Sequence, residues 1–270
     1  MSVSWTIKSS PLSSLLKTMP QDKKNIHLGG TARSPEDVQA LHALGLQFAE
    51  IPLPDRFSQG LDVYRELKDR LGMYYLCHGP LEGDPNDIKG LQEKYLPKVL
   101  ASFPLMKTLG ASLLTIHLWL DARFVKEETL SLKLDILRKI LTMAEQAGIV
   151  VCLENLSESA THLRDALDQL PQLYLTLDLG HAQLLTDLNR SDEILEHYPD
   201  RIRHVHLHDN RGGHSPNADL HLPIGEGVID FKGIFSKLRG MGYARTMTLE
   251  LKPKEIEASL PLVRKLLDLD

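Results

Sequence analysis

The most informative stretch of the chain runs from Ile202 to Asp230 and reads IRHVHLHDNRGGHSPNADLHLPIGEGVID. It begins by alternating histidine with apolar residues, the pattern of a strand whose alternate side chains lie on opposite faces. His204, His206 and His208 would then share one face. A row of imidazoles has no role against an outer layer of helices, whereas inside a barrel the same row can end at a metal ion. The stretch therefore predicts a metal site inside a barrel.

Composition sets the broad class. The chain has 270 residues, of which 42% are hydrophobic and 25% charged, which is ordinary for a globular protein with a sizeable core. No apolar run approaches the roughly 18 residues that a membrane span needs, and the N-terminus lacks the pattern of a secretory signal, so we expect a cytoplasmic protein. Cys77 and Cys152 are too few for a disulfide framework and are expected to be packed thiols.

Short β-rich runs alternate along the chain with amphipathic stretches of helical length, which indicates parallel βα units. The eight runs are 25–30, 46–53, 73–79, 112–120, 149–155, 173–181, 202–209 and 245–251. The expected helices are 34–44, 60–71, 90–109, 125–147, 159–170, 183–197, 231–240 and 254–267. This order predicts an α/β fold, a single (β/α)8 TIM barrel over residues 25–270, preceded by a short N-terminal extension, residues 1–24.

In such a barrel the chemistry lies at the C-terminal ends of the strands. Imidazoles and carboxylates stand at these ends or in the loops just beyond: Glu50, His78, His117, Glu154, Asp178, His181, His206, Asp219, His221 and Glu250. This set of nitrogen and oxygen donors suits zinc, manganese or a similar divalent ion. The sequence therefore predicts a divalent-metal site at the mouth of the barrel.

Each residue also has a structural interpretation. His117, taken alone in LLTIHLWL, is the kind of histidine that a core satisfies by hydrogen bonding, and His204 is expected to be a core or ligand-supporting imidazole. Glu154, Asp178 and Glu250 are different, because a carboxylate in an apolar strand costs several kcal/mol unless it is paired or bound to metal. Their equivalent positions at strand ends favour metal binding.

At these residues the chain resembles the xylose isomerase-like TIM barrels, and within them the endonuclease IV (AP endonuclease family 2) branch. The resemblance covers nearly everything after residue 24 and also includes the GEG of Gly225–Gly227 with the IDF that follows. It is carried by the motifs LCHGPL, TIHLWL, LENL, DLGH, HLHD, DLHLPIGEG and LEL. Each motif alone is weak, but together they fill all nine metal-ligand positions of that branch in order.

The resemblance implies three metal ions, most simply zinc, with manganese as an alternative. The first would be held by His78, His117 and a bridging Glu154; the second by Glu154, Asp178, His206 and Glu250; the third by His181, Asp219 and His221. Such a cluster lowers the pKa of a water molecule and neutralises phosphoryl oxygens, so it implies phosphoester hydrolysis.

The isomerase and epimerase branch of the same barrels implies a second function. There only the second group would hold a metal, and Glu154 and Glu250 would act as an acid/base pair that moves a proton beside a carbonyl group. The two functions differ in whether the first and third groups bind metal. Because the ligands of both groups are present, the hydrolase is favoured.

A DNA-repair function is less well supported. The loop after His78 reads GPLEGDPND, which is acidic through Glu82, Asp84 and Asp87 and lacks an aromatic wedge, whereas a duplex-binding enzyme needs basic loops to contact phosphates. The formal net charge of −5 points the same way. The arginines that could contact a phosphate or carboxylate are scattered: Arg33, Arg56 and Arg211.

The sequence therefore predicts a metal-dependent hydrolase of a small, sugar-like or phosphorylated molecule, with Glu154 and Glu250 as catalytic groups. Arg211, His208 and Glu50 are the candidate substrate contacts, and Glu50 and His208 could instead orient a ligand. Three alternatives remain: a sugar or polyol isomerase or epimerase, an abasic-site endonuclease, and a metal-binding barrel without catalysis. The intact acid/base carboxylates argue against the last.

Overall fold

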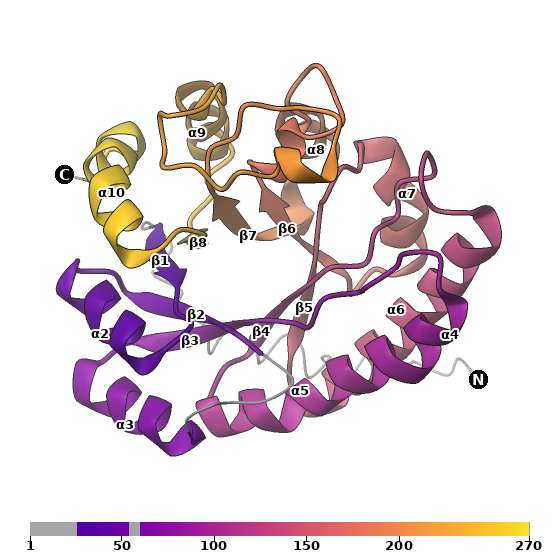
Figure 1. The fold of residues 1–270 in the computed structure, drawn as a ribbon, viewed down its shortest axis with the longest axis horizontal. Coiled ribbons are helices and arrows are strands. Elements are labelled where there is room, and N and C mark those ends of the chain that lie inside the picture. The colour runs from indigo at the N-terminus through magenta and orange to yellow at the C-terminus, as the bar shows by residue number, and fades with distance from the viewer. Residues whose placement is uncertain (1–25, 54–59, 270) are drawn as a thin grey trace, which may run out of the picture.

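A computed structural model describes residues 26–53 and 60–269 of the chain. Eight parallel strands pair in sequence order and close into a barrel, with the helices arranged around the outside (Figure 1). The predicted (β/α)8 fold is confirmed, whereas the predicted extension, residues 1–24, lies outside the described residues. The strands are β1 His27–Thr31, β2 Phe48–Pro52, β3 Tyr74–His78, β4 Leu113–Ile116, β5 Val150–Glu154, β6 Tyr174–Asp178, β7 Ile202–Leu207 and β8 Thr246–Leu249.

The longer helices follow the strands one by one: α2 Pro35–Ala43, α3 Leu61–Leu71, α5 Leu96–Leu109, α6 Glu127–Ala147, α7 Ala160–Gln169, α8 Ser191–His197, α9 Phe231–Gly240 and α10 Pro253–Leu267. A short turn, α4 Ile88–Gly90, and a π-helical turn, η1 Leu91–Tyr95, precede α5. Short 3-10 turns lie at η2 His181–Gln183, η3 Pro199–Arg201 and η4 Pro216–Ala218. Within the described residues, no helix is both long and apolar enough to cross a bilayer.

Local sequence signals fix the helix ends. Ser34 caps α2 and forms a capping box with Asp37, while Pro35 occupies the first turn, where a missing N–H costs nothing. At the other end of two longer helices, Gly110 and Gly148 adopt the left-handed conformation that closes a helix and that glycine reaches without strain. These signals explain why most predicted helices lie where the structure has them.

One predicted helix was wrong in its extent. The sequence pattern indicated a helix over residues 183–197, but α8 begins only at Ser191. Asn189 interrupts the pattern: its amide donates to the Leu179 carbonyl at 2.9 Å, and its side-chain oxygen accepts from the Ser191 N–H at 2.9 Å. Leu185, at φ 54°, is also incompatible with a continuous right-handed helix. The segment between β6 and α8 is therefore a 3-10 turn and a loop, which pairs with Gly213 in the loop after β7.

The barrel interior changes from apolar to polar along its axis. One layer is an apolar cluster of Phe48, Leu76, Leu113, Val150 and Cys152. A hydroxyl pair lies in the interior as well, where Thr115 Oγ1 and Thr176 Oγ1 are 2.8 Å apart. Both cysteines, Cys77 and Cys152, are buried free thiols, as predicted. The strand ends beyond these layers carry the histidines and carboxylates, so the core itself sets the depth of the site.

Candidate metal centre

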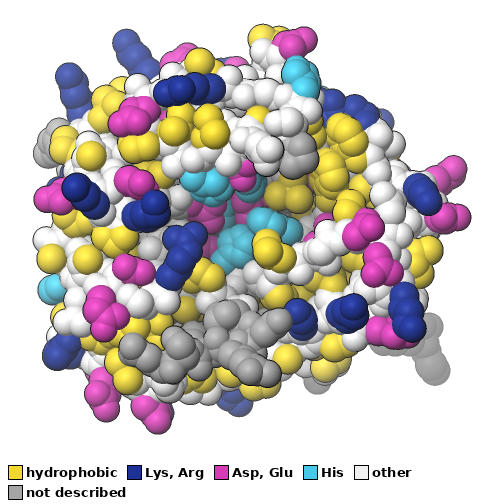
Figure 2. All heavy atoms as spheres, viewed as in Figure 1, with side chains coloured by type: hydrophobic (Ala, Val, Ile, Leu, Met, Phe, Trp, Pro, Cys, Tyr) yellow, Lys and Arg dark blue, Asp and Glu magenta, His cyan; other side chains and the backbone are white. Residues whose placement is uncertain are grey.

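A pocket of about 550 Å³ opens at the C-terminal ends of the strands. Figure 2 shows histidine and acidic side chains gathered in the central hollow of this face. Six of the predicted ligands line the pocket: His78, His117, His181, Asp219, His221 and Glu250. The remaining three, Glu154, Asp178 and His206, are fully buried beneath them. The fold thus brings all nine side chains to one end of the barrel.

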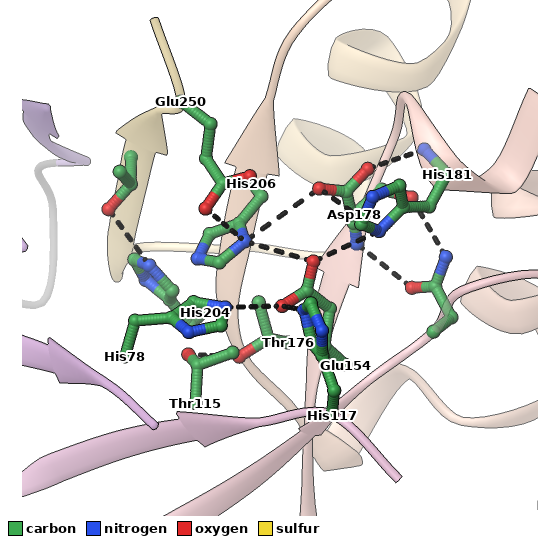
Figure 3. A network of polar contacts seen from close by, with 12 residues as sticks. His78, Thr115, His117, Glu154, Thr176, Asp178, His181, His204, His206 and Glu250 are labelled. Carbon is green, nitrogen blue, oxygen red and sulfur yellow. Dashed lines mark hydrogen bonds and ion pairs between the residues drawn. The ribbon is translucent and has the colours of Figure 1, made fainter. Parts of the chain in front are cut away.

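Glu154, at the end of β5, is the centre of the arrangement (Figure 3). Its Oε2 lies 2.9 Å from His117 Nε2 and 3.1 Å from His78 Nε2. Its Oε1 lies 3.0 Å from His181 Nδ1 and 3.3 Å from His206 Nδ1. The two oxygens of one carboxylate therefore face two different groups of imidazoles, which is the geometry that a bridging ligand requires.

We call Glu154, Asp178, His206 and Glu250 the floor. His206 Nδ1 lies 3.3 Å from Glu154 Oε1, 3.3 Å from Glu250 Oε1 and 3.7 Å from Asp178 Oδ2. One donor atom from each floor residue lies within 4.8 Å of the others. Ligands held 2.0–2.2 Å from a common ion have a similar mutual spacing. The floor can therefore hold one divalent ion with little rearrangement.

We call His181, Asp219 and His221 the rim. Asp219 Oδ2 lies 3.3 Å from His181 Nε2 and 3.2 Å from His221 Nε2. The rim residues come from the turn after β6 and the long loop after β7, and His221 adopts a left-handed conformation at φ 45°, which is uncommon for a residue other than glycine. Together with His208 they form a second group of donor atoms within 4.8 Å of one another.

Unsatisfied buried atoms test whether these residues fit a metal. Glu154 Oε1, His181 Nδ1 and His206 Nδ1 are buried, and none forms a hydrogen bond within the described part of the chain. Glu154 Oε1 lies 3.0 Å from His181 Nδ1 and 3.3 Å from His206 Nδ1, so the three atoms converge without satisfying hydrogen-bond geometry. Buried polar atoms are rarely left in this state. Atoms that share a cation would behave in this way, and the donor set fits zinc or a similar ion.

Without metal, the cluster holds protons instead. Burial lowers the pKa of His78, but the hydrogen bond to Glu154 and the charges of the surrounding carboxylates together outweigh burial and raise the pKa to about 9. Burial also lowers the pKa of His221, but its hydrogen bond to Asp219 and the nearby carboxylate charges together outweigh burial and raise the pKa to about 9. Burial raises the pKa of Glu154, yet the nearby His117 and His206 hold it well below its usual value. Metal and protons therefore compete for the same atoms.

Glu50 and His204 support the floor from below. The other nitrogen of His206, Nε2, lies 3.2 and 3.1 Å from the two oxygens of Glu50. Glu50 Oε2 also lies 3.0 Å from His204 Nε2, and His204 Nδ1 lies 2.7 Å from Thr246 Oγ1. A carboxylate on the second nitrogen of a metal-binding histidine fixes its ring and tautomer. Glu50 thus presents Nδ1 of His206 to the floor.

Two of the predicted substrate contacts lie away from the open pocket. His208 is fully buried; its Nε2 lies 3.1 Å from Asp178 Oδ1, and its ring stacks on His221 with centroids 3.8 Å apart. Arg211 is exposed and lies outside the pocket lining. Arg33 does line the pocket, whereas Arg56 lies outside the described residues. Of the two described arginines that the sequence analysis named, Arg33 therefore lies at the pocket and Arg211, the predicted substrate contact, does not.

Two glycine motifs are explained by close packing. A Cβ atom at Gly180, in DLGH, would lie 2.0 Å from the His208 ring. Asp209, almost fully buried, accepts the backbone N–H groups of Gly225 and Gly227 at 2.9 and 2.8 Å, and a Cβ atom at Gly227 would collide with it. Asp209 therefore shapes the loop that carries Asp219 and His221, a role that the sequence analysis missed.

Sequence reasoning also missed Asn155, the residue after Glu154. Its side-chain amide donates to the Asp178 carbonyl at 2.9 Å, and its side-chain oxygen accepts from the Asp178 N–H at 2.9 Å. This paired contact fixes the end of β6 against the end of β5. The sequence signal that could have identified Asn155 is an amide side chain directly after a strand-end carboxylate.

The acidic loop after β3 is less acidic at the mouth than its sequence indicated. Glu82 is buried and forms an ion pair with Lys133, a fully buried side chain of α6. Glu82 also accepts the Trp119 N–H at 2.8 Å, and Lys133 donates to the Trp119 carbonyl at 2.7 Å. Counting Glu82 as a mouth charge was therefore wrong. Its role is to tie the loops after His78 and His117 to α6.

Fold and site together define a class, that of TIM barrels whose mouth gathers candidate metal ligands. The family model for the xylose isomerase-like TIM barrel, the AP endonuclease 2 family, matches residues 38–266, so the chain belongs to that family. The predicted resemblance is confirmed.

Individual relatives are more distant. An uncharacterized protein of Methanocaldococcus jannaschii is 34% identical over 126 residues, which cover 43% of this chain and 41% of that protein. A probable endonuclease 4 of Thermosipho melanesiensis is 22% identical over 238 residues, covering 76% of this chain and 82% of that protein. The chain thus spans less than half the length of the first of these relatives.

Solved structures share the fold. A D-tagatose 3-epimerase-like protein is 21% identical with a TM-score of 0.77, covering 90% of this chain and 97% of that one. The IolI protein, solved with a zinc atom, is 15% identical with a TM-score of 0.75, covering 90% of this chain and 98% of that one. At these identities the similarity establishes the fold alone.

Proposed function

We propose that the chain is a divalent-metal-dependent hydrolase that cleaves a phosphoester or related bond in a small molecule and binds up to three ions, with zinc preferred. The observation that carries this proposal is the rim. His181, Asp219 and His221 form a ligand group of their own, 3.2–3.3 Å apart, beside a floor that is already complete. A second ligand group beside the floor is what a multinuclear site requires.

The proposed roles follow from position. The floor would hold one ion and the rim another, while His78 and His117 would share Glu154 with the floor. When bound, such ions supply a hydrolytic nucleophile at neutral pH and neutralise phosphoryl charge. Glu250 is the floor residue that reaches the open pocket, so it is placed to exchange a proton with the substrate. Glu50 keeps His206 oriented.

The size of the pocket supports a small substrate. Its volume of about 550 Å³ lies within the range of ordinary small-molecule sites. The ligands lie at its base, so the bond that reacts would have to enter the barrel mouth.

The test combines metal content with activity. Protein purified without chelator and reconstituted with zinc or manganese is assayed by elemental analysis and for hydrolysis of bis(4-nitrophenyl) phosphate and of an abasic DNA duplex. We expect more than one ion per chain and turnover of the small diester that Glu154→Gln abolishes, with weak retention and little nicking of the duplex. A single ion with no turnover would contradict the hydrolase. Robust nicking abolished by Glu154→Gln would instead assign the abasic-site endonuclease.

A second candidate is a sugar or polyol isomerase or epimerase. Glu154 Oε1 and Glu250 Oε1 both lie 3.3 Å from His206 Nδ1, so two carboxylates flank one metal position, as an acid/base pair would. The fold shared with a D-tagatose 3-epimerase-like protein is consistent with this role. Here one carboxylate would remove a proton beside the substrate carbonyl while the other returned it.

Proton exchange distinguishes the two candidates. An epimerase incubated with a ketose in D₂O would incorporate deuterium at the carbon beside the carbonyl, which proton NMR detects. A hydrolase would leave that position unlabelled. Deuterium incorporation by the wild-type protein, lost in Glu250→Gln, would favour the epimerase.

A further inference from the structure

Two basic residues line the pocket on the sector of the mouth that supplies few ligands. Arg33 lies in the turn after β1, and Lys98 lies in the first turns of α5. Both line the same pocket as His78 and Glu250. Figure 2 shows basic side chains at the edge of the hollow. The substrate pocket therefore combines a metal-ligating base with cationic groups on its wall.

Arg33 has a fixed backbone and an available side chain. Its N–H donates to Asp37 Oδ2 at 2.8 Å, so the residue is part of the cap that begins α2. Its guanidinium forms no ion pair or hydrogen bond with any described residue. Thr31 lines the pocket two residues earlier, and its buried Oγ1 has no hydrogen-bond partner in the described part of the chain. Both groups can donate to a ligand.

Charge decides what kind of group fits there. Five carboxylates surround the base of the pocket: Glu50, Glu154, Asp178, Asp219 and Glu250. Three divalent ions more than cancel them, and the positive charge of Arg33 then adds to that of the loaded pocket. With one ion the base would remain negative. A fully loaded pocket with a cationic wall favours an anion, and arginine is well suited to a phosphate or carboxylate.

We propose that Arg33 and Lys98, with Thr31, form a subsite for an anionic group of the substrate, a phosphate or carboxylate separate from the bond that reacts at the metals. The inference rests on the proposed metal-dependent function and deepens it. The substrate class is then a small polyol or sugar that carries a charge at one end.

The test measures binding to the zinc-loaded protein by calorimetry with three probes: ribose 5-phosphate, ribonate and neutral ribose. We expect the wild type to prefer one or both anions over ribose. In Arg33→Gln/Lys98→Gln this preference should fall by about tenfold to a hundredfold, the usual effect of losing hydrogen bonds to a charged group. Ribose 5-phosphate and ribonate separate a phosphate subsite from a carboxylate subsite.

The control is Arg65→Gln/Lys94→Gln, which removes the same charge from two exposed residues outside the pocket lining. Its preference for anions should match the wild type. A preference that survives in Arg33→Gln/Lys98→Gln would overturn the subsite, because the anion would then bind the ions alone. Equal loss in the control, or no preference in the wild type, would also overturn it. Elemental analysis of the wild type tests the metal site separately, so the two proposals can fail independently.

Discussion

The floor and the rim hold the same kinds of ligand in different ways. The floor side chains are 0–14% exposed and come from the ends of β5 to β8, where strand pairing fixes them. The rim side chains are 8–36% exposed and come from a turn and a loop. The floor thus follows from the barrel itself, whereas the rim depends on loop sequences such as DLGH and DLHLP. The barrel therefore positions the floor, whereas the loops determine whether a second ligand group lies beside it.

The largest effect is expected at the residue that the two regions share. Glu154→Ala removes a carboxylate that contacts His78, His117, His181 and His206. Activity should fall by about a thousandfold or more, since a lost metal ion removes several kcal/mol of transition-state stabilisation. Metal content should fall too, while circular dichroism still reports a folded barrel. Turnover that survives the substitution would show that the site is elsewhere.

His221→Ala breaks the rim alone. His221 contacts Asp219 at 3.2 Å, whereas it reaches the floor through the backbone carbonyl of Glu250 at 3.1 Å and the Glu250 carboxylate only at 3.8 Å. The variant should therefore lose one ion per chain and keep the ion of the floor. Elemental analysis beside the wild type measures this. One ion in both proteins would mean that the rim is only a hydrogen-bonded loop, and the isomerase would then be favoured.

His117→Ala separates a ligand from a core histidine. The side chain is 17% exposed and lies 2.9 Å from Glu154. As a ligand it should weaken one ion selectively, with a small change in melting temperature of the metal-free protein. If His117 is instead a core histidine, the variant should keep its metal content and have a clearly lower melting temperature in the metal-free form. Comparing metal content with the metal-free melting curve therefore decides between the two interpretations.

Glu50→Gln tests the support beneath the floor. The amide keeps the shape of the side chain but loses the charge that orients His206, so affinity for the floor ion should fall by about 10- to 100-fold. The cobalt-substituted protein should also show an altered visible spectrum for that ion only. Thr248→Val, which removes a 3.0 Å contact to His204 but none to His206, is the control and should leave the spectrum unchanged.

The smallest effect concerns pH. In the metal-free protein the pKa values of His78 and His221 are raised from 6.5 to about 9, so their protonation stabilises the fold below pH 6.5 and that contribution is lost as pH rises through 9. The melting temperature of metal-free protein should therefore fall between pH 6.5 and 9.5. Metal-loaded protein, whose histidines are already neutral, should lack this fall. A flat curve for both forms would contradict the proposed competition between metal and protons.

Much of the fold could be predicted because short β-rich runs alternate with amphipathic helical patterns along the chain. The grouping of His78, Glu154 and Glu250 followed from one rule, that strand ends meet at one face. The start of α8 could not be predicted in this way, because the Asn189 side chain bonds to backbone ten residues earlier. Local periodicity contains no information about such a contact.

The residues that hold the candidate ligands in place were even harder to predict from the sequence. Glu50 and His206 are 156 positions apart, and only the closure of the barrel brings them to 3.1 Å. Glu82 looked like a surface acid because its neighbours are polar, yet its partner Lys133 lies on α6. A single sequence shows which residues carry chemistry more readily than which residues hold them in place.

The π-helical turn at Leu91–Tyr95 has a consequence for how the pocket could change. A wide turn contains one residue more than a regular helix needs. Removing that residue would let the turn close as a regular α-helix and would shift the side chains at the turn. Tyr95, whose hydroxyl donates to the His117 carbonyl, and Lys98, in the pocket wall, lie at or just after this turn. A single-codon deletion there would thus change the pocket wall beside Lys98 and the contact of Tyr95 with the His117 backbone, without removing any of the nine ligands.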